Sequence, residues 1–161
     1  MVDNIGIGYT NLVIPTSGMK LLTVSYYDNY NYPNGITPPS LVEGQTVATS
    51  VTGQATGGWV RVLTTASETL NEQSYTLYDL KYRPIRTYTT NHLGGYTRVD
   101  SKLDFSGKVL QTLAYHKLNS SATELKLTDT FGYTEEDRLL LHKHKINSNA
   151  CLLYTSPSPR D

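Results

Sequence analysis

Two histidines separated by one residue are the strongest candidate for metal chemistry in this sequence. His142 and His144 flank Lys143, so on a β-strand both imidazoles project from the same face. Imidazole is a common ligand of Zn²⁺, but a site needs a third ligand that converges on the same point. Cys151 lies in a terminal segment that we do not expect to be native, and no other third ligand is visible. We therefore expect no metal site and no cofactor.

The other residue types that carry acid–base or nucleophilic chemistry lack partners at a useful spacing. His92 lies in a glycine-rich turn, and His116 lies on the polar face of an expected strand. Ser101 and Ser106 lack the Gly-x-Ser-x-Gly pattern of a hydrolase nucleophile, and no phosphate-binding glycine loop occurs. We expect no catalytic residues among them.

Carboxylates offer two further possibilities. The acidic run 135–137 lacks the Asp and Gly spacing of a calcium loop and is typical of a solvated turn. A glycosidase would need two carboxyls across a cleft. Asp100 and Asp104 are candidates for that role, but no motif or spacing in the sequence supports them. We therefore predict that the protein is not an enzyme.

Tyrosines concentrate near the start of the chain, at Tyr26, Tyr27, Tyr30 and Tyr32. Aromatic faces stack on sugar rings, so this cluster could form a glycan-binding surface. The same residues also serve strand packing, which is the commoner role of aromatic side chains in sheets. Both interpretations stay open at this point.

Composition places these residues on a sheet. The chain has 161 residues, enough for one domain, with 13 tyrosines, abundant threonine and only 17% charged residues. Its 14 basic and 14 acidic residues balance, so nucleic acid is not an expected partner. No apolar run has the length of a membrane span, and the first residues do not resemble a signal peptide. We predict an all-β fold.

Eight stretches rich in β-branched and aromatic residues read as strands: 20–27, 59–65, 74–78, 85–90, 96–103, 108–118, 122–131 and 138–146. Turn residues separate them, which predicts an antiparallel meander of β-hairpins. Residues 1–19 form a lead-in, and 20–147 form the hairpin region. Within that region, 29–58 is rich in proline and glycine, and we expect a loop or insertion with one short strand near 47–51.

Three of the turns share a frame that starts at Tyr78, Leu103 and Tyr133, 25 and then 30 residues apart. The frame holds an aromatic or Leu, usually an Asp, two variable residues, a turn position, a basic residue and then apolar positions. Asp can accept hydrogen bonds from the amides ahead of it, and the fifth position suits a residue that tolerates positive φ. Such a period indicates units that bury apolar surface by stacking on neighbours.

At these residues the sequence resembles the RHS/YD-repeat family, whose repeat has Tyr-Asp, two variable residues, Gly-Arg and apolar positions. The matching residues, which we expect to be structural, are Tyr78, Asp79, Arg83, Asp104, Gly107, Lys108, Tyr133 and Arg138. Blocks at 22–28, 59–63, 91–95 and 104–109 are similar to the region upstream of the core domain in large bacterial RHS proteins. The resemblance covers about 20–147.

The sequence departs from the family pattern at three turn positions. Tyr82 and Asp137 stand where the family has glycine, and Thr134 stands where it has Asp. We therefore expect longer or non-primed connections at those two hairpins.

The resemblance implies β-strand repeats that wind into a hollow shell enclosing or presenting a C-terminal toxin-like domain. It implies a secreted or surface-displayed protein, of which this chain is a non-catalytic fragment. The partners would be the remainder of the same polypeptide, namely further YD repeats, a core domain and the C-terminal domain. The alternative is a cell-surface carbohydrate-binding or adhesin-like module, whose partners would be glycans.

The end of the chain differs from the rest. Residues 151–161 resemble one reading frame of a sequencing adapter, so we expect 148–161 to be a non-native or disordered tail. Pro157 and Pro159 lack the amide donor that a strand needs. We therefore expect these residues to lie outside the fold.

Overall fold

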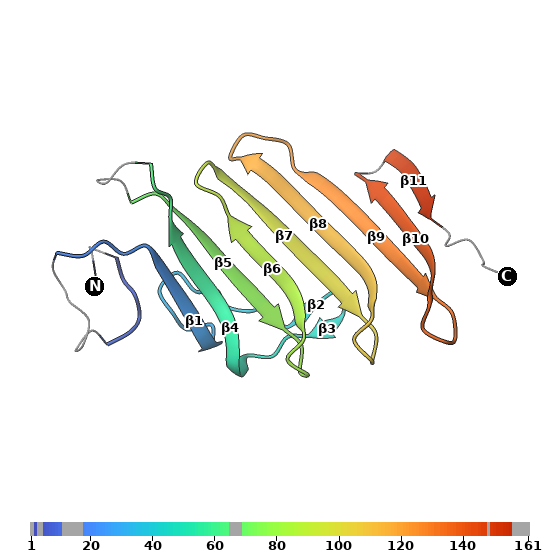
Figure 1. The fold of residues 1–161 in the computed structure, drawn as a ribbon, viewed down its shortest axis with the longest axis horizontal. Helices are drawn as coiled ribbons and strands as arrows, with labels where there is room; N and C mark the ends of the chain where they lie inside the picture. Colours follow the sequence, from blue (N-terminus) through green and yellow to red (C-terminus); the bar gives the residue numbers. More distant parts are fainter. Residues whose placement is uncertain (1, 3–4, 11–17, 65–68, 148, 156–161) are drawn as a thin grey trace.

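The computed structural model describes residues 2, 5–10, 18–64, 69–147 and 149–155. It is an all-β antiparallel meander, as the sequence predicts (Figure 1). The strands are β1 (Thr23–Asn29), β2 (Leu41–Val42), β3 (Gln45–Thr46), β4 (Ser50–Arg61), β5 (Asn71–Tyr78), β6 (Pro84–Thr90), β7 (Gly94–Leu103), β8 (Val109–Asn119), β9 (Leu125–Tyr133), β10 (Leu139–Ile146) and β11 (Asn149–Thr155). No helix in this described part is long and apolar enough to cross a membrane.

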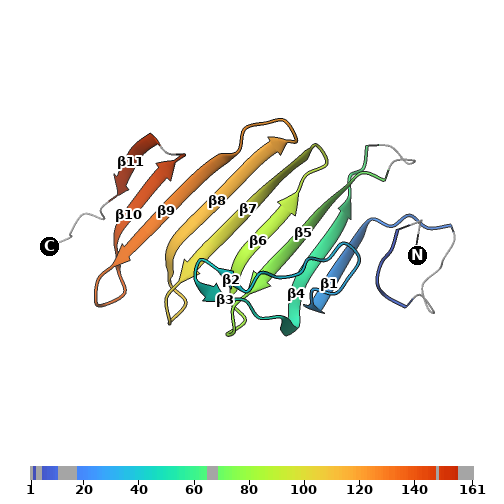
Figure 2. The same cartoon turned by 180° about the vertical axis from the view of Figure 1, so that it is seen from behind.

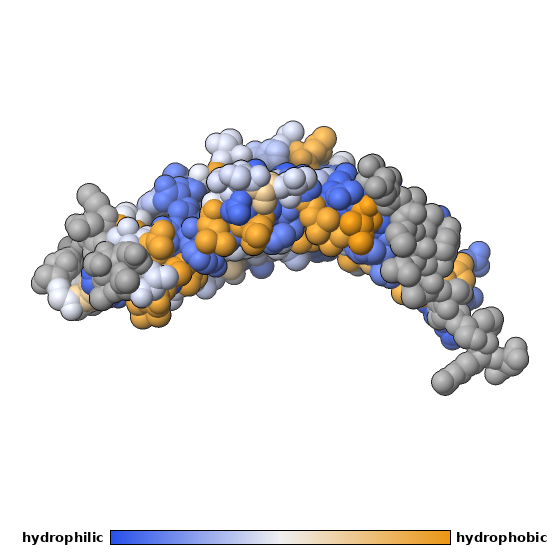
Figure 3. Space-filling view, turned by 90° about the horizontal axis from the view of Figure 1, so that it is seen from above, coloured by the Kyte–Doolittle hydropathy of each residue, from blue (hydrophilic) through white to orange (hydrophobic). Residues whose placement is uncertain are grey.

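Nine strands form one sheet in the order β1-β4-β5-β6-β7-β8-β9-β10-β11, and every adjacent pair is antiparallel. The small hairpin β2–β3 lies between β1 and β4 in the chain and forms a separate two-stranded sheet over one face of the large sheet (Figure 2). Seen from above, the sheet is arched (Figure 3). We call the side that carries β2–β3 the hairpin face and the other side the open face.

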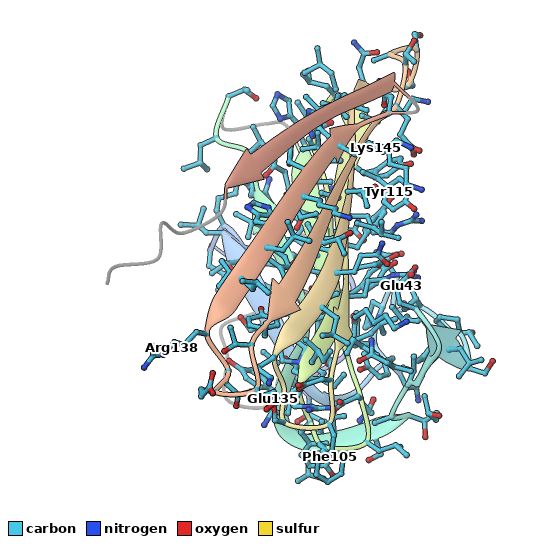
Figure 4. The ribbon with its side chains drawn as sticks, turned by 90° about the vertical axis from the view of Figure 1, so that its right-hand side faces the viewer. Glu43, Phe105, Tyr115, Glu135, Arg138 and Lys145 are labelled. Carbon is cyan, nitrogen blue, oxygen red and sulfur yellow. The ribbon has the colours of Figure 1, made fainter. Side chains whose placement is uncertain are left out.

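Cross-strand register assigns side chains to the two faces, because directly opposed residues point to the same side. Tyr115 and Lys145 project on the side of β2–β3 and Glu43 (Figure 4). Residues of the same alternation, such as Leu113, lie on the hairpin face with them. Leu127 belongs to the other alternation and lies on the open face. Leu113 is buried, whereas Leu127 is half-buried.

Two buried clusters lie where the N-terminal segment and the loop between β1 and β4 cover the sheet. One combines residues of the loop with β4, β5 and β6: Tyr30, Val42, Val47, Ala48, Val51, Leu77, Tyr78 and Ile85. The other is Val2, Ile7, Val24, Tyr26 and Trp59. The expected lead-in 1–19 therefore contributes core residues; its residues 1, 3–4 and 11–17 lie outside the described part.

The prediction of a loop over 29–58 is wrong for the second half of that range, because β4 begins at Ser50. The glycine content of this strand reflects close packing against a tyrosine ring. A Cβ on Gly57 would lie 2.1 Å from the Tyr32 hydroxyl oxygen, so only glycine lets the ring lie against the strand. Val51 and Thr56 are fully buried, although the surrounding sequence has few apolar residues.

The expectation that the tail lies outside the fold is also wrong for residues 149–155. They form β11, which pairs with β10 in the register His142↔Thr155 and His144↔Leu153. Without this strand β10 would be an edge with unpaired amides and carbonyls, and such an edge accepts another strand. Pro157 and Pro159 lie beyond Thr155, outside the described residues.

Candidate functional site: a ladder of turns and a histidine–aspartate cluster

The three framed turns share one backbone geometry. In each, the amide of the first turn residue donates to the carbonyl four residues on, and its carbonyl accepts from the amide three residues on. The first turn residues are Asp79, Asp104 and Thr134, with N···O distances of 3.0, 2.9 and 2.8 Å for the first bond. The corresponding distances for the second bond are 2.9, 3.2 and 3.1 Å. This pattern is that of a type I turn followed by a bulge.

The fifth frame position has positive φ in all three turns, as predicted: 61° at Tyr82, 104° at Gly107 and 65° at Asp137. Non-primed connections occur at Tyr82 and Asp137, as expected. Gly107 has the same connection, however, so the departures from glycine do not change the turn. Backbone hydrogen bonds and strand pairing therefore outweigh the cost of placing a side chain in the left-handed region.

An aspartate side chain closes two of these turns. The Asp79 Oδ1 atom accepts from the amides of Lys81 and Arg83, both at 2.9 Å. Its Oδ2 atom accepts from Arg83 Nε at 2.7 Å and lies 2.6 Å from Arg83 Nη2. Burial raises the pKa of Asp79, but the bonds from Arg83 and Lys81 outweigh it, so its pKa lies below the usual value.

The second turn repeats this arrangement with a more exposed carboxylate. Asp104 Oδ1 accepts from the Ser106 hydroxyl at 2.7 Å and from the amides of Gly107 and Lys108 at 2.8 Å. The Ser106 hydroxyl and these amides lower the pKa of Asp104 to about 2. In the third turn Thr134 Oγ1 accepts from the Arg138 amide at 3.3 Å. A hydroxyl therefore takes the aspartate's place with one long hydrogen bond.

The basic residues of the first two frames, Arg83 and Lys108, reach toward the following turn. Arg83 Nη1 donates to the carbonyls of Asp104 and Phe105, at 3.0 and 3.1 Å. Lys81 Nζ donates to the Phe105 carbonyl at 2.9 Å and lies over its ring. Lys108 Nζ pairs with the Asp137 carboxylate. These contacts link the turns into a ladder along one end of the strands, which we call the turn ladder (Figure 1).

The tyrosines of the frame anchor the strands that enter the turns. Tyr78 is buried and its hydroxyl donates to the Ala55 carbonyl at 2.7 Å. The Tyr133 hydroxyl donates to the Val109 carbonyl at 2.8 Å. Arg138 occupies the frame position of Arg83, but its side chain points away from the molecule (Figure 4). All eight predicted repeat residues therefore lie at the turns, and seven of them join or anchor neighbouring strands.

His142 and His144 lie on the open face, and the structure supplies the third residue that the sequence did not reveal. Asp129 on β9 lies directly opposite His144 on β10. Its Oδ1 atom is 2.7 Å from His142 Nε2 and 2.8 Å from His144 Nδ1. The three ligand atoms lie within 4.8 Å of one another. Hairpin register counted back from the turn at Thr134 would have identified Asp129.

The surroundings of this cluster hold its rings in place. The ring of Phe131 stacks on His142, with centroids 4.6 Å apart and planes 18° apart. Partial burial raises the pKa of Asp129, but hydrogen bonds from His144 and His142 outweigh it and leave the pKa below its usual value. The geometry allows either a hydrogen-bonded triad or a metal site.

The remaining histidines have single partners in the described part of the chain. His92 Nδ1 lies 3.3 Å from a Glu72 carboxylate oxygen in an exposed turn. His116 Nδ1 lies 2.9 Å from the Thr97 hydroxyl.

The two aspartates considered for glycoside hydrolysis each bind different partners. Asp100 is 2% exposed and is held by Arg86 through two contacts of 2.5 and 2.7 Å. Asp104 closes its own turn, where it also binds the Ser106 hydroxyl. Ser101 uses its backbone carbonyl, which accepts from the Gln45 side-chain amide at 2.7 Å. Of the acidic run 135–137, Asp137 pairs with Lys108.

Most of the tyrosine cluster is used in packing. Tyr26 and Tyr30 are 6% and 5% exposed and belong to different core clusters. Tyr26 stacks on Tyr32 with centroids 4.2 Å apart, and desolvation raises the pKa of Tyr32 to about 12. Beside them lies a cavity of about 160 Å³, lined by aromatic rings and by polar side chains, among them Tyr26, Tyr32, Trp59, Tyr75, Tyr88, Asn34 and Gln73.

No protein-family model matches this chain, and no curated protein or solved structure matches it at a significant level.

Proposed function

We propose that this chain is a non-catalytic structural segment of a secreted or surface RHS/YD-repeat protein. In this proposal its hairpins contribute to a β-shell that encloses or presents a C-terminal toxin-like domain. The turn ladder is the observation that carries the proposal. It fastens each repeat to the next through residues of the repeat frame itself, which is what an extended array of stacked units requires.

The contacts of the ladder run in one direction along the sheet. Arg83 reaches the turn at Asp104, and Lys108 reaches the turn at Asp137. Arg138 stands in the same frame position, one step further along. In the proposed array its guanidinium would donate to the turn of a following repeat, as Arg83 does. The arch of the sheet also suits a shell wall (Figure 3).

The complete reading frame tests this proposal. The expected result is a parent protein with further Tyr-Asp-x-x-Gly-Arg frames after this segment, which electron microscopy of the purified protein shows as a hollow shell. A parent without further frames, or an isolated solid domain of this size, would overturn the proposal.

A second candidate function is recognition of a small carbohydrate by the aromatic cavity. It is favoured by a cavity lining that combines the aromatic residues Tyr32, Tyr75 and Tyr88 with the amide-bearing residues Asn34 and Gln73. Tyr75 and Tyr88 stack on each other at 4.9 Å and come from adjacent strands. Rings supply stacking surface and amides supply hydrogen bonds, which are the two contacts that fix a ligand's orientation in such sites.

Glycan-array binding by the monomeric protein separates the two candidates. The carbohydrate function predicts a signal that Tyr88→Ala and Gln73→Ala abolish and that Tyr27→Ala leaves unchanged. Tyr27 is the matched control because it is 51% exposed and does not line the cavity. Absence of binding to every sugar rejects this candidate and leaves the structural proposal intact.

A further inference from the structure

We propose that Asp129, His142 and His144 form a binding site for one divalent transition-metal ion, with Zn²⁺ as the best-suited ion. The inference goes beyond the structural function, because no step of the turn ladder uses these residues. The first support for it is the chemical type of the three ligands. Two imidazoles and one carboxylate are the donors that Zn²⁺ takes in sites with three protein ligands, where water fills the fourth position.

Strand pairing fixes the ligands without help from a loop. His142 and His144 alternate with Lys143 on β10 and so share the open face, and Asp129 is opposite His144 on the adjacent strand. Ligands from paired strands keep their spacing because the backbone hydrogen bonds of the ladder hold both strands. Stacking of Phe131 on His142 restricts the rotation of that ring.

Distances agree with a site that closes on an ion by a small movement. Tetrahedral Zn²⁺ bound at about 2.0 to 2.2 Å places its ligand atoms roughly 3.3 Å apart. The two nitrogens now lie 2.7 and 2.8 Å from Asp129 Oδ1. A shift of about half an ångström away from Asp129 Oδ1 would bring each nitrogen to that separation, and all three ligand atoms already lie within 4.8 Å of one another.

Charge and access also favour a cation. The side chains of Asp129, His142 and His144 are 22%, 32% and 26% exposed, so an ion can enter from solvent while the ligands stay ordered. Lys143 and Lys145 alternate to the hairpin face, where Figure 4 shows Lys145. The lysines next to the histidines in sequence therefore do not crowd the ion.

The site would clamp β9 to β10, next to the strand β11 that carries Cys151. Cys151 is the chain's one cysteine and thiolates also bind Zn²⁺. The test therefore uses the full chain with Cys151→Ser, so that any ion bound must be held without the thiol.

Isothermal titration with Zn²⁺ and the visible absorption of added Co²⁺ measure the site. The expected result is one ion per chain with a Co²⁺ spectrum of low coordination number. Asp129→Asn keeps the shape of the side chain and should weaken Zn²⁺ affinity more than about 100-fold, because losing even an outer-shell partner costs roughly 10 to 100-fold. His142→Gln and His144→Gln should do the same, and circular dichroism without metal establishes that each variant keeps its strands.

His116→Gln is the matched control, since His116 lies on the same face and contacts Thr97. Its affinity should equal that of the parent chain. No Zn²⁺ binding by the folded parent chain, or binding that survives Asp129→Asn and both glutamine variants, would overturn the proposal. In that case the three residues form a hydrogen-bonded triad only.

Discussion

Removing the Arg83 side chain tests whether the turn ladder stabilises the sheet. Arg83→Met keeps the aliphatic part of the side chain but removes two contacts to the Asp79 carboxylate and the two hydrogen bonds that Nη1 donates to the next turn. The Asp79 side chain is 8% exposed and that of Arg83 25% exposed. After the change, Asp79 keeps only the backbone amides of Lys81 and Arg83.

The expected loss of unfolding free energy follows from the intermediate burial of this ion pair. Exposed ion pairs contribute about 0 to 1 kcal/mol, whereas removing one partner of a buried pair costs about 3 to 5 kcal/mol. The pair of Asp79 and Arg83 lies between these limits, so we expect a loss of about 2 to 3 kcal/mol. For a domain of this size that loss lowers the melting temperature by roughly 4 to 12 °C.

Urea unfolding followed by circular dichroism measures the loss, with Arg138→Met as the matched control. Arg138 has the same frame position, but its side chain is exposed and points away from the molecule. Its substitution should change the free energy of unfolding by no more than about 0.5 kcal/mol. Equal effects of the two substitutions, or a negligible effect of Arg83→Met, would refute the idea that Arg83 fastens one repeat to the next.

Three further predictions concern the core, the turns and acid stability. Leu113→Ala should lower the free energy of unfolding by roughly 2 to 4 kcal/mol, and Leu127→Ala should lower it clearly less. The reason is that Leu113 is 9% exposed on the hairpin face, whereas Leu127 is half-buried on the open face. Thermal unfolding compares the two variants, and equal losses would contradict the assignment of faces. Tyr82→Gly should raise stability by up to about 1 kcal/mol, since Tyr82 has φ 61°. Gly107→Ala, at φ 104°, should lower it by a similar amount, and urea midpoints decide both signs. Hydrogen bonds from Ser106 and the turn amides lower the pKa of Asp104 to about 2. A folded pKa below the unfolded value of about 3.9 means that this stabilisation is present above pH 4 and is lost as the pH falls toward 2. The stability difference between the parent chain and Asp104→Asn should therefore shrink over that range, and a difference independent of pH would contradict it.

Hairpin turns were predictable because their chemistry is local. An Asp that accepts the amides two to four residues ahead, followed by a position with positive φ, lies within a few residues of sequence. Asp79 and Asp104 both behave in this way. Stretches rich in β-branched and aromatic residues likewise predicted the strands from β5 to β10, since these residue types favour a strand whichever strand it pairs with.

Other features could not be predicted because they depend on contacts between distant segments. The glycines of β4 indicate a loop until Tyr32 is placed against Gly57. Val2 and Ile7 join the core only because the start of the chain packs beside β1 and β4. Residues 149–155 form β11 because β10 offers an edge, which composition alone does not reveal.

The sequence by itself determined an all-β meander, the positions of its turns and the residues that close them, because these depend on neighbours in the chain. Only the tertiary structure decided which face each strand presents, that Arg83 and Lys108 reach the following turns, and that Asp129 meets His142 and His144. These depend on cross-strand register, in which a shift of one residue moves every side chain to the opposite face.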